Sequence, residues 1–350
     1  MTTSGLIVAI LVFGLLIVIH ELGHFLVAKA YDVKVHEFAV GFGPTLAKVR
    51  KGETEYSLRL LPLGGYCRMA GMDETEEDEP RGFNKKPVLQ RMAIILAGPL
   101  ANFLLASLIY SGLLYFVGTQ RLDEPIVGSV PPVCDVVMAE GTGTAPCPAY
   151  SAGVQKGDVI LSINGTAVGD WDDIVSLVSR SEGQPVSVRL RRDDEVLELT
   201  MQPVPSSDGR WIVGLGGMTK REPLLIALVK GPVLTVEALG AMVVGLVQMF
   251  TGSMPMELTG PVGITKGIAQ QAAMGWANLS LFVAYLSLNL GFFNLLPIPA
   301  LDGSRIGFML VELVRGRRVD PQRENMVHFV GFLLLLGLMV VVAYGDILRW

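Results

Sequence analysis

The chain has 350 residues, of which 51% are hydrophobic and only 17% are charged, and its formal net charge is -5. This composition is typical of a polytopic membrane protein with a smaller soluble part, and it excludes an ordinary soluble enzyme. The acidic balance, with no basic tract, also argues against a nucleic acid as a partner.

The first apolar segment, residues 5–28, is long enough to cross a bilayer and contains the pentapeptide HELGH. It has no basic leader and no small-residue cleavage site, so we expect it to be retained. Two imidazoles and a carboxylate each cost roughly 2 to 3 kcal/mol inside a spanning helix, so they need a function there. Positions i and i+4 share a helix face, so His20 and His24 could bind one metal ion beside Glu21. This arrangement is typical of a zinc hydrolase.

Between the first two apolar segments the sequence predicts strands. Apolar and polar residues alternate from Val33 to Met69 around several glycines, which indicates short strands with tight turns. The acidic run Asp73–Glu79 is expected to be a solvated surface loop. We therefore expect a β-rich loop here, and a packed thiol at Cys67.

Three further segments have the length and composition of membrane spans: residues 92–117, about 279–296, and 327–344. A fifth apolar segment, residues 224–250, is interrupted by Lys230 and other polar or helix-breaking residues. Lysine and arginine residues cluster in the loop after the first span and in the loop before the last, and the positive-inside rule puts both loops in the cytoplasm. This leaves four spans with both termini outside, and it predicts an amphipathic helix on the outer face at 224–250.

Residues 125–204 have a different composition, with short β-rich runs such as 186–190, glycine turns and a helix expected after Trp171. They predict a compact domain of about 80 residues on the outer side of the membrane. Cys134 and Cys147 lie in this domain. A disulfide and two free thiols are both open, and the oxidising compartment favours the disulfide.

A catalytic zinc ion commonly takes three protein ligands, so HELGH needs a partner elsewhere. Glu37 and Glu53 are conceivable, but both follow the end of the first span. Asp302 is the better candidate, because the prolines of NLLPIPALDG, residues 294–303, open the third span at the depth of HELGH. An aspartate that merely caps this turn is the alternative. The remaining histidines are assigned to structure or to the membrane interface; they are His36 and His328.

With both motifs present, the chain resembles the site-2 protease family of intramembrane zinc metalloproteases, in particular its bacterial branch of the regulator-of-sigma-E type. The resemblance covers nearly the whole chain. Besides HELGH and NLLPIPALDG, it includes LLPLGGYCRM at residues 60–69, GPLANF at 98–103 and GPVGI at 260–264. The family pattern has a second glycine after Gly303, where this chain has Ser304, and we expect little consequence.

The resemblance implies three Zn²⁺ ligands, one catalytic glutamate and one substrate-binding residue, which fall on His20, His24, Asp302, Glu21 and Asn294. For the last of these, a role in pairing backbone groups near Pro297 is nearly as well supported. The run SAGVQKGDVILSING, residues 151–165, resembles part of a single PDZ domain.

The resemblance further implies a protease of the bacterial cell (inner) membrane that cuts transmembrane segments of single-pass proteins embedded in the lipid bilayer. It would make the second cut of regulated intramembrane proteolysis, with anti-sigma factors or signal-peptide remnants as substrates. The PDZ-like domain would either bind an exposed C-terminus or admit only substrates already shortened outside, and the resemblance favours the second role. Two alternatives remain: a membrane zinc carrier or sensor with the same ligands, and an inactive PDZ scaffold.

The expected fold is a polytopic α-helical membrane protein of about four transmembrane helices, with a membrane-associated β-rich loop and an inserted extracytoplasmic PDZ-like α+β domain. In chain order the expected segments are a first span at 1–30, the β-rich loop at 31–91, a second span at 92–117, the PDZ-like domain at 118–205, an amphipathic membrane-surface segment at 206–277, a third span with the LDG motif at 278–303, a cytoplasmic loop at 304–326 and a fourth span at 327–345.

Overall fold

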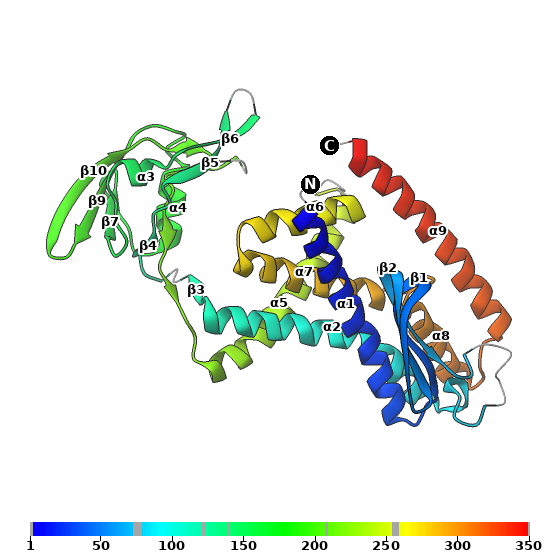
Figure 1. Ribbon diagram of the computed structural model, residues 1–350. Helices are drawn as coiled ribbons and strands as arrows, with labels where there is room; N and C mark the ends of the chain where they lie inside the picture. Colours follow the sequence, from blue (N-terminus) through cyan, green and yellow to red (C-terminus); the bar gives the residue numbers. More distant parts are fainter. Residues whose placement is uncertain are drawn as a thin grey trace. The chain divides into compact units, whose positions relative to one another are not determined.

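The computed structural model describes residues 3–72, 79–120, 123–138, 141–206, 209–253 and 259–348. Residues 73–78 of the predicted acidic loop lie outside these ranges. The chain divides into two compact units (Figure 1), one made of Met1–Leu113 with Leu224–Trp350 and the other of Leu114–Pro223. All the residues of the predicted metal site belong to the first unit.

The first unit is mainly helical. Its helices are α1 (Thr3–Ala30), α2 (Val88–Phe116), α5 (Leu224–Phe250), α6 (Pro261–Ala273), α7 (Trp276–Leu295), α8 (Asp302–Arg315) and α9 (Pro321–Leu348), with a short 3-10 helix η2 (Phe83–Lys85) before α2. Within the described residues, five helices are long and apolar enough to cross a membrane: α1, α2, α5, α7 and α9. The class of polytopic membrane protein is therefore confirmed.

Three predicted segments differ from the structure. The predicted cytoplasmic segment at 304–326 is helical over its first half, where α8 lies, and its place in the cytoplasm stays a prediction. Its charges belong to an amphipathic helix whose Met309 is buried, while Glu312 pairs with Arg91 of α2 at 2.6 Å. The predicted surface segment at 206–277 contains two separate helices, α5 and α6. In the predicted third span at 278–303, α7 ends at Leu295 and α8 begins at Asp302.

Helix α1 lies at the centre of this unit, between two groups of neighbours (Figure 1). Its first half packs against α6 and α7, and its second half packs against α2, α8 and the β-rich loop. The buried residues at the first contact include Ala9, Val12, Leu16, Ile268 and Val283, and those at the second include Ala28, Val33, Val35, Ile94 and Met309. Both ends of α1 are thereby held by elements distant in sequence.

The predicted strands after α1 are confirmed as two long strands, β1 (Val35–Lys51) and β2 (Thr54–Met69), which pair with several irregularities. Residues 37–40 of β1 lie between two segments of β2, because they pair with 65–68 and also with 55–58. Residues 45–51 then pair with 54–59.

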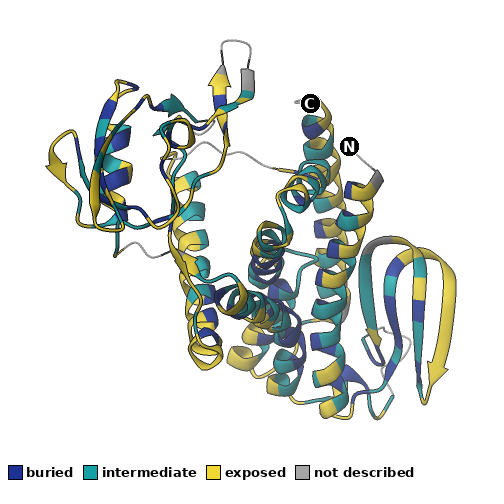
Figure 2. Cartoon of the chain, turned by 60° about the vertical axis from the view of Figure 1, so that its left-hand side comes forward, coloured by how far each residue is buried: buried dark blue, intermediate teal, exposed yellow. Residues whose placement is uncertain are grey.

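The result is a sheet of four strand segments in the order 45–51, 54–59, 35–42 and 61–69. Gly41 has φ 92°, a left-handed conformation that lets β1 bend between its two segments. The segment 45–51 is exposed (yellow in Figure 2), and 61–69 forms the opposite edge next to α1. Among the described residues, no further strand pairs with 61–69.

The second unit is rich in short strands. They are β3 (Thr119–Gln120), β4 (Val127–Ser129), β5 (Val133–Met138), β6 (Gly141–Pro146), β7 (Val159–Ile163), β8 (Thr166–Ala167), β9 (Val186–Arg192), β10 (Glu195–Met201), β11 (Val204–Pro205), β12 (Trp211–Ile212), β13 (Gly216–Gly217) and β14 (Thr219–Lys220), accompanied by helices α3 (Pro148–Ser151) and α4 (Trp171–Ser179). The predicted β-rich runs and the helix after Trp171 are thus present. The main sheet has the order β10-β9-β7-β8, and the buried side of α4 packs against it (Figure 2).

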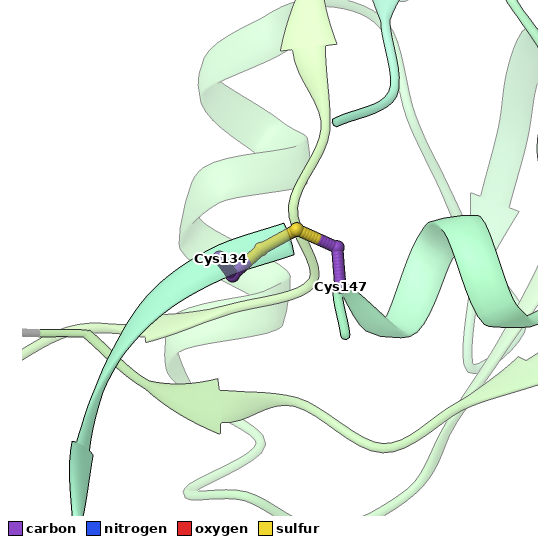
Figure 3. The surroundings of a disulfide bond; sticks show 2 residues. All are labelled: Cys134 and Cys147. Atoms are coloured by element: carbon purple, nitrogen blue, oxygen red, sulfur yellow. A yellow bond between two sulfur atoms is a disulfide. The ribbon is translucent and has the colours of Figure 1, made fainter. Parts of the chain in front are cut away.

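The disulfide that the sequence favours is present in this unit, between Cys134 of β5 and Cys147, the residue before α3 (Figure 3). Both sulfur atoms lie against Gly214, whose φ of 76° and close surroundings leave no room for a side chain. The disulfide therefore joins β5 to the start of α3 and packs against the segment between β12 and β13.

Candidate metal centre

The HELGH helix and the proline-rich turn bring three side chains together. Nε2 of His20 and Nε2 of His24, both on α1, lie 3.1 and 3.2 Å from Oδ2 of Asp302, the first residue of α8. The two imidazole nitrogens are 3.2 Å apart. Both histidines are buried, so the three side chains form one close cluster.

This cluster fits a tetrahedral zinc ion. Zinc binds histidine nitrogen and carboxylate oxygen at about 2.0 to 2.2 Å, so the ligand atoms around a tetrahedral ion lie roughly 3.3 Å apart. The distances of 3.1 to 3.2 Å among the three atoms agree with that spacing. Two imidazoles and one carboxylate also leave the fourth position of the tetrahedron for water, as a catalytic site requires.

The far ring nitrogens orient the two imidazoles. Nδ1 of His24 lies 2.9 Å from the carbonyl oxygen of Ile94 and donates its proton there, which leaves Nε2 unprotonated and able to bind a metal. Nδ1 of His20 lies 3.1 Å from the amide of Asn102, a residue with no exposed surface. Backbone and side-chain groups of α2 therefore hold both rings.

The Asn102 amide completes this arrangement if its oxygen faces His20. Oδ1 of Asn102 has no hydrogen-bond partner among the described residues. A half-turn of the amide puts Oδ1 in the position of the nitrogen, where it accepts the Nδ1 proton of His20 and leaves Nε2 unprotonated. Oδ1 of Asn102 and Nδ1 of His20 are then paired with each other. Asn102 belongs to the GPLANF motif, but nothing in the sequence alone joins it to His20.

We expect Asn102→Leu to weaken zinc binding about 10- to 100-fold, which is the usual effect of removing a group that orients a metal-binding histidine. Asn102→Asp keeps an acceptor for the Nδ1 proton and should stay close to the wild type. Competition with a zinc chelator, on protein purified in detergent, measures both affinities. Equal zinc affinity in the leucine variant would contradict this role.

Two glycines allow α1 and α2 to approach closely enough for the site. A Cβ at Gly23 would overlap the carbonyl of Ala97, and a Cβ at Gly98 would overlap the His24 imidazole. Only glycine has the space at either position. The glycine of GPLANF therefore leaves room for a ring that belongs to HELGH.

The proline-rich turn places Asp302. Helix α7 ends at Leu295, and α8 begins at Asp302. Gly303 approaches the last carbonyls of α7 so closely that a Cβ would overlap them. Ser304, where the family pattern has glycine, donates from Oγ to the carbonyl of Leu301 at 2.8 Å and is buried. The serine therefore fits here and adds a hydrogen bond to the turn.

The side chain of Glu21 extends from α1 toward the edge of the sheet. The backbone N–H of Cys67 donates to its carboxylate, and Gly65 packs against its side chain. Burial, with a smaller effect of the Glu21 charge, raises the pKa of the Cys67 thiol to about 12, so this cysteine stays protonated. The edge segment 61–69 therefore passes directly beside the predicted catalytic carboxylate.

The two other conceivable ligands are engaged elsewhere. Burial alone would raise the pKa of Glu37, but hydrogen bonds from Arg59, Ser57 and Tyr66 at 2.6 to 2.8 Å outweigh it and lower this pKa to about 2. Glu53 pairs with Lys29 and Arg81. Both carboxylates therefore hold the β-rich loop together.

The predicted substrate-binding residue lies on α7 near its end. The amide nitrogen of Asn294 donates to the carbonyl of Leu290 at 2.9 Å, within its own helix. This contact does not test substrate binding. The Leu290 carbonyl lies inside α7 and is not one of the groups that Pro297 frees, so the alternative role near the turn stays a prediction too.

Comparisons with known proteins agree with this site. The model of peptidase family M50 matches residues 8–338. Zinc metalloprotease RasP of Geobacillus kaustophilus is 33% identical over 430 aligned residues, covering 100% of this chain and 99% of that protein. The regulator of sigma-W protease RasP of Bacillus subtilis is 32% identical over 433 residues, covering 100% and 99%.

A solved PDZ domain of an SdrC-like protein from Listeria monocytogenes matches 25% of this chain and 87% of its own, at 16% identity and a TM-score of 0.19. That TM-score does not assign a fold to the second unit, so the PDZ-like domain stays a prediction. The family match, by contrast, covers nearly the full length and includes every residue of the cluster. The chain belongs to peptidase family M50 and is a zinc metalloprotease.

Proposed function

We propose that this metalloprotease hydrolyses peptide bonds within the transmembrane segments of single-pass membrane proteins in the bacterial cell membrane. Its zinc ligands would be His20, His24 and Asp302, and its general base Glu21. The observation that carries the proposal is the three-atom cluster on α1 and α8, within a unit whose long helices are apolar enough to span a bilayer. A soluble substrate would not need a site so enclosed by apolar helices.

Zinc, when bound, lowers the pKa of a coordinated water toward 7 and polarises a carbonyl. Glu21 would take the proton of the attacking water and then deliver it to the departing amine. The N–H of Cys67 orients the Glu21 carboxylate for this task. With Nδ1 of each ring directed at a group of α2, the Nε2 atoms of His20 and His24 would be the ones that bind the ion.

A transmembrane helix hides its peptide bonds in internal hydrogen bonds, so the substrate must unwind before it can be cut. We propose that the unwound segment pairs with the edge segment 61–69 as an added strand. Two observations support this proposal. No described strand pairs with that edge, and its residues Gly65 and Cys67 lie against Glu21.

Proline substitutions in the substrate test the strand pairing. A proline lacks the N–H that a ladder bond needs, and one lost bond with its steric clash should slow cleavage about tenfold. Prolines at alternate residues of the paired stretch should be harmful, and those at the residues between them, whose N–H points away, should be less so. A gel assay of substrate variants in proteoliposomes measures the rates. Equal cleavage of both sets would rule out strand addition.

Four spans with both termini outside remain the topology we propose, and the packing of α5 supports it. Thr235 of α5 hydrogen-bonds Ser107 of α2 at 2.8 Å. The N–H of Glu222, just before α5, donates to the carbonyl of Leu114 near the end of α2 at 3.0 Å, so α5 starts on the side where α2 ends. Helix α6, which follows α5, packs Ile268 against the first half of α1, and Asp346 near the end of α9 accepts from its Gly263 N–H at 2.9 Å. In this topology those elements all lie outside. Helix α5 would therefore begin and end outside, although it is apolar enough to cross.

We propose that the second unit acts as a filter that admits only substrates already shortened outside, so that this enzyme makes the second cut on anti-sigma factors or signal-peptide remnants. The name of the Bacillus subtilis relative, regulator of sigma-W protease, supports this substrate class. The unit is inserted as one compact body, whose two ends meet where β3 pairs with β14. Its removal should therefore leave the catalytic unit connected by a short linker.

Replacing residues 121–218 with a few glycines should let full-length substrate be cleaved without a prior cut. The linker can be short because Thr119 and Lys220 are paired. Immunoblotting of cells that lack the first protease measures the product. The same deletion combined with Glu21→Gln controls for cleavage by other proteases. Continued dependence on a prior cut would mean that discrimination lies elsewhere.

A further inference from the structure

Helix α9 meets the proline-rich turn that presents Asp302 through one partly buried polar side chain, that of His328. Nδ1 of His328 accepts a hydrogen bond from the backbone N–H of Ala300 at 3.1 Å, and the His328 side chain is only 15% exposed. One helical turn further, Gly331 lies so close to Pro299 that a Cβ there would overlap the proline. The His328 imidazole therefore lies against a turn that is some thirty residues away in sequence.

The Ala300 N–H needs this acceptor for a physical reason. Pro297 and Pro299 have no N–H, and the neighbouring N–H groups of Ile298 and Leu301 bond to carbonyls inside the turn. Ala300 has φ 75°, a left-handed conformation that costs a non-glycine residue about 1 to 3 kcal/mol. Ala300 is partly buried, so leaving its N–H without an acceptor would favour another conformation of the turn.

The conformation of the turn determines where Asp302 lies in the metal site. Leu301 donates to the carbonyl of Ile298 at 3.1 Å, and Ser304 donates from both its N–H and its Oγ to the carbonyl of Leu301. Asp302 lies between these anchored residues, with Oδ2 within 3.2 Å of both imidazoles. Because the ligand atoms are so close together, a shift of about 1 Å in the turn would take Oδ2 out of reach of a shared ion.

We propose that His328 is a positioning residue for the metal centre: through Nδ1 it holds the Ala300 N–H and so fixes the turn that presents Asp302. The inference rests on the ligand set proposed above. The Nε2 atom of His328 is not needed for this role. It is buried without a hydrogen-bond partner among the described residues, and its nearest carboxylate, Glu324, is 4.0 Å away.

The roles of the two ring nitrogens of His328 can be tested separately by substitution. Asn carries a polar atom near the position of Nδ1 and nothing near Nε2, whereas Gln carries its polar atoms near the position of Nε2. His328→Asn should therefore keep the hydrogen bond to Ala300, and His328→Gln should lose it. His328→Leu removes both. Phe329→Leu, on the exposed side of the same turn of α9, is the matched control.

The test measures zinc affinity by chelator competition on the full chain in lipid nanodiscs, without reference to cleavage. We expect His328→Leu and His328→Gln to weaken zinc binding about 10- to 100-fold, as is usual for groups that orient metal ligands. His328→Asn and Phe329→Leu should stay within about threefold of the wild type. Thermal unfolding of the zinc-free proteins should be similar for the asparagine and glutamine variants.

Wild-type zinc affinity in the glutamine variant overturns the proposal, and so does equal weakening in the asparagine and glutamine variants. If the leucine variant does not fold, the asparagine and glutamine pair still decides. Asp302→Ala is measured in parallel. If it binds zinc as tightly as the wild type, the proposed ligand set is wrong, and the inference about His328 falls with it. If only Asp302→Ala is impaired, the ligand set holds and the role of His328 is refuted.

Discussion

Replacing Glu21 with glutamine is expected to slow cleavage of a model transmembrane substrate by about 10²- to 10⁴-fold while the protein keeps its zinc. Glutamine has nearly the same size and can still accept the hydrogen bond from the Cys67 N–H, so the fold around it should persist. It cannot take a proton from water. The loss should therefore appear in kcat rather than in metal content.

This experiment also separates the protease from the zinc carrier or sensor, because those alternatives do not need a proton acceptor beside the metal. Zinc is measured by elemental analysis and cleavage by gel assay, on the same preparation. Glu237→Gln is the matched control, since Glu237 is an exposed carboxylate on the apolar helix α5, outside the cluster. Cleavage at the wild-type rate in the Glu21 variant would refute the assignment of the general base.

Replacing Gly98 with alanine is expected to remove the metal site while leaving the rest of the fold in place. The added Cβ would occupy the space of the His24 imidazole. The two helices cannot separate easily to make room, because Gly23 is packed against the backbone of Ala97. The ring must rotate away, which breaks its hydrogen bond to Ile94 and moves Nε2 from the cluster.

We expect this variant to lose at least about 100-fold in zinc affinity, since one of the three proposed ligands is displaced and its orienting bond is lost. Chelator competition measures the affinity, and circular dichroism checks that the helices remain. Gly112→Ala is the control on the same helix, because a Cβ there meets nothing within 4 Å. Wild-type zinc binding in the Gly98 variant would show that His24 does not bind the metal in this geometry.

Both substitutions affect a side chain of α1: Glu21 itself, and His24 through the added Cβ at Gly98. The neighbours of α1 explain why this small site needs a large surrounding structure. Helix α2 orients the two histidines, the edge strand of the β-rich loop lies against Glu21, and the turn between α7 and α8 supplies Asp302. Each of these contacts comes from a different part of the chain. The HELGH motif therefore supplies two of the three proposed ligands, and the rest of the unit supplies their orientation.

The sequence by itself determined the features that depend on local patterns. The length and apolar character of the long helices follow from composition, the shared face of His20 and His24 follows from their spacing, and the opening before Asp302 follows from Pro297 and Pro299. The alternation that predicts strands after α1 is equally local. Such patterns act over a few residues, so they can be read without knowing the neighbours.

Only the tertiary structure decided the features that depend on distant contacts. Helix α8 forms in a segment whose charges suggested a loop, because its apolar side, with Met309, packs into the core. The roles of three residues can be recognised only from their contacts in the structure: Asn102 and Gly98 contact the imidazoles, and His328 contacts the proline-rich turn. These residues carry no local signal, because a hydrogen bond or a close approach between distant segments leaves no periodic trace in the chain.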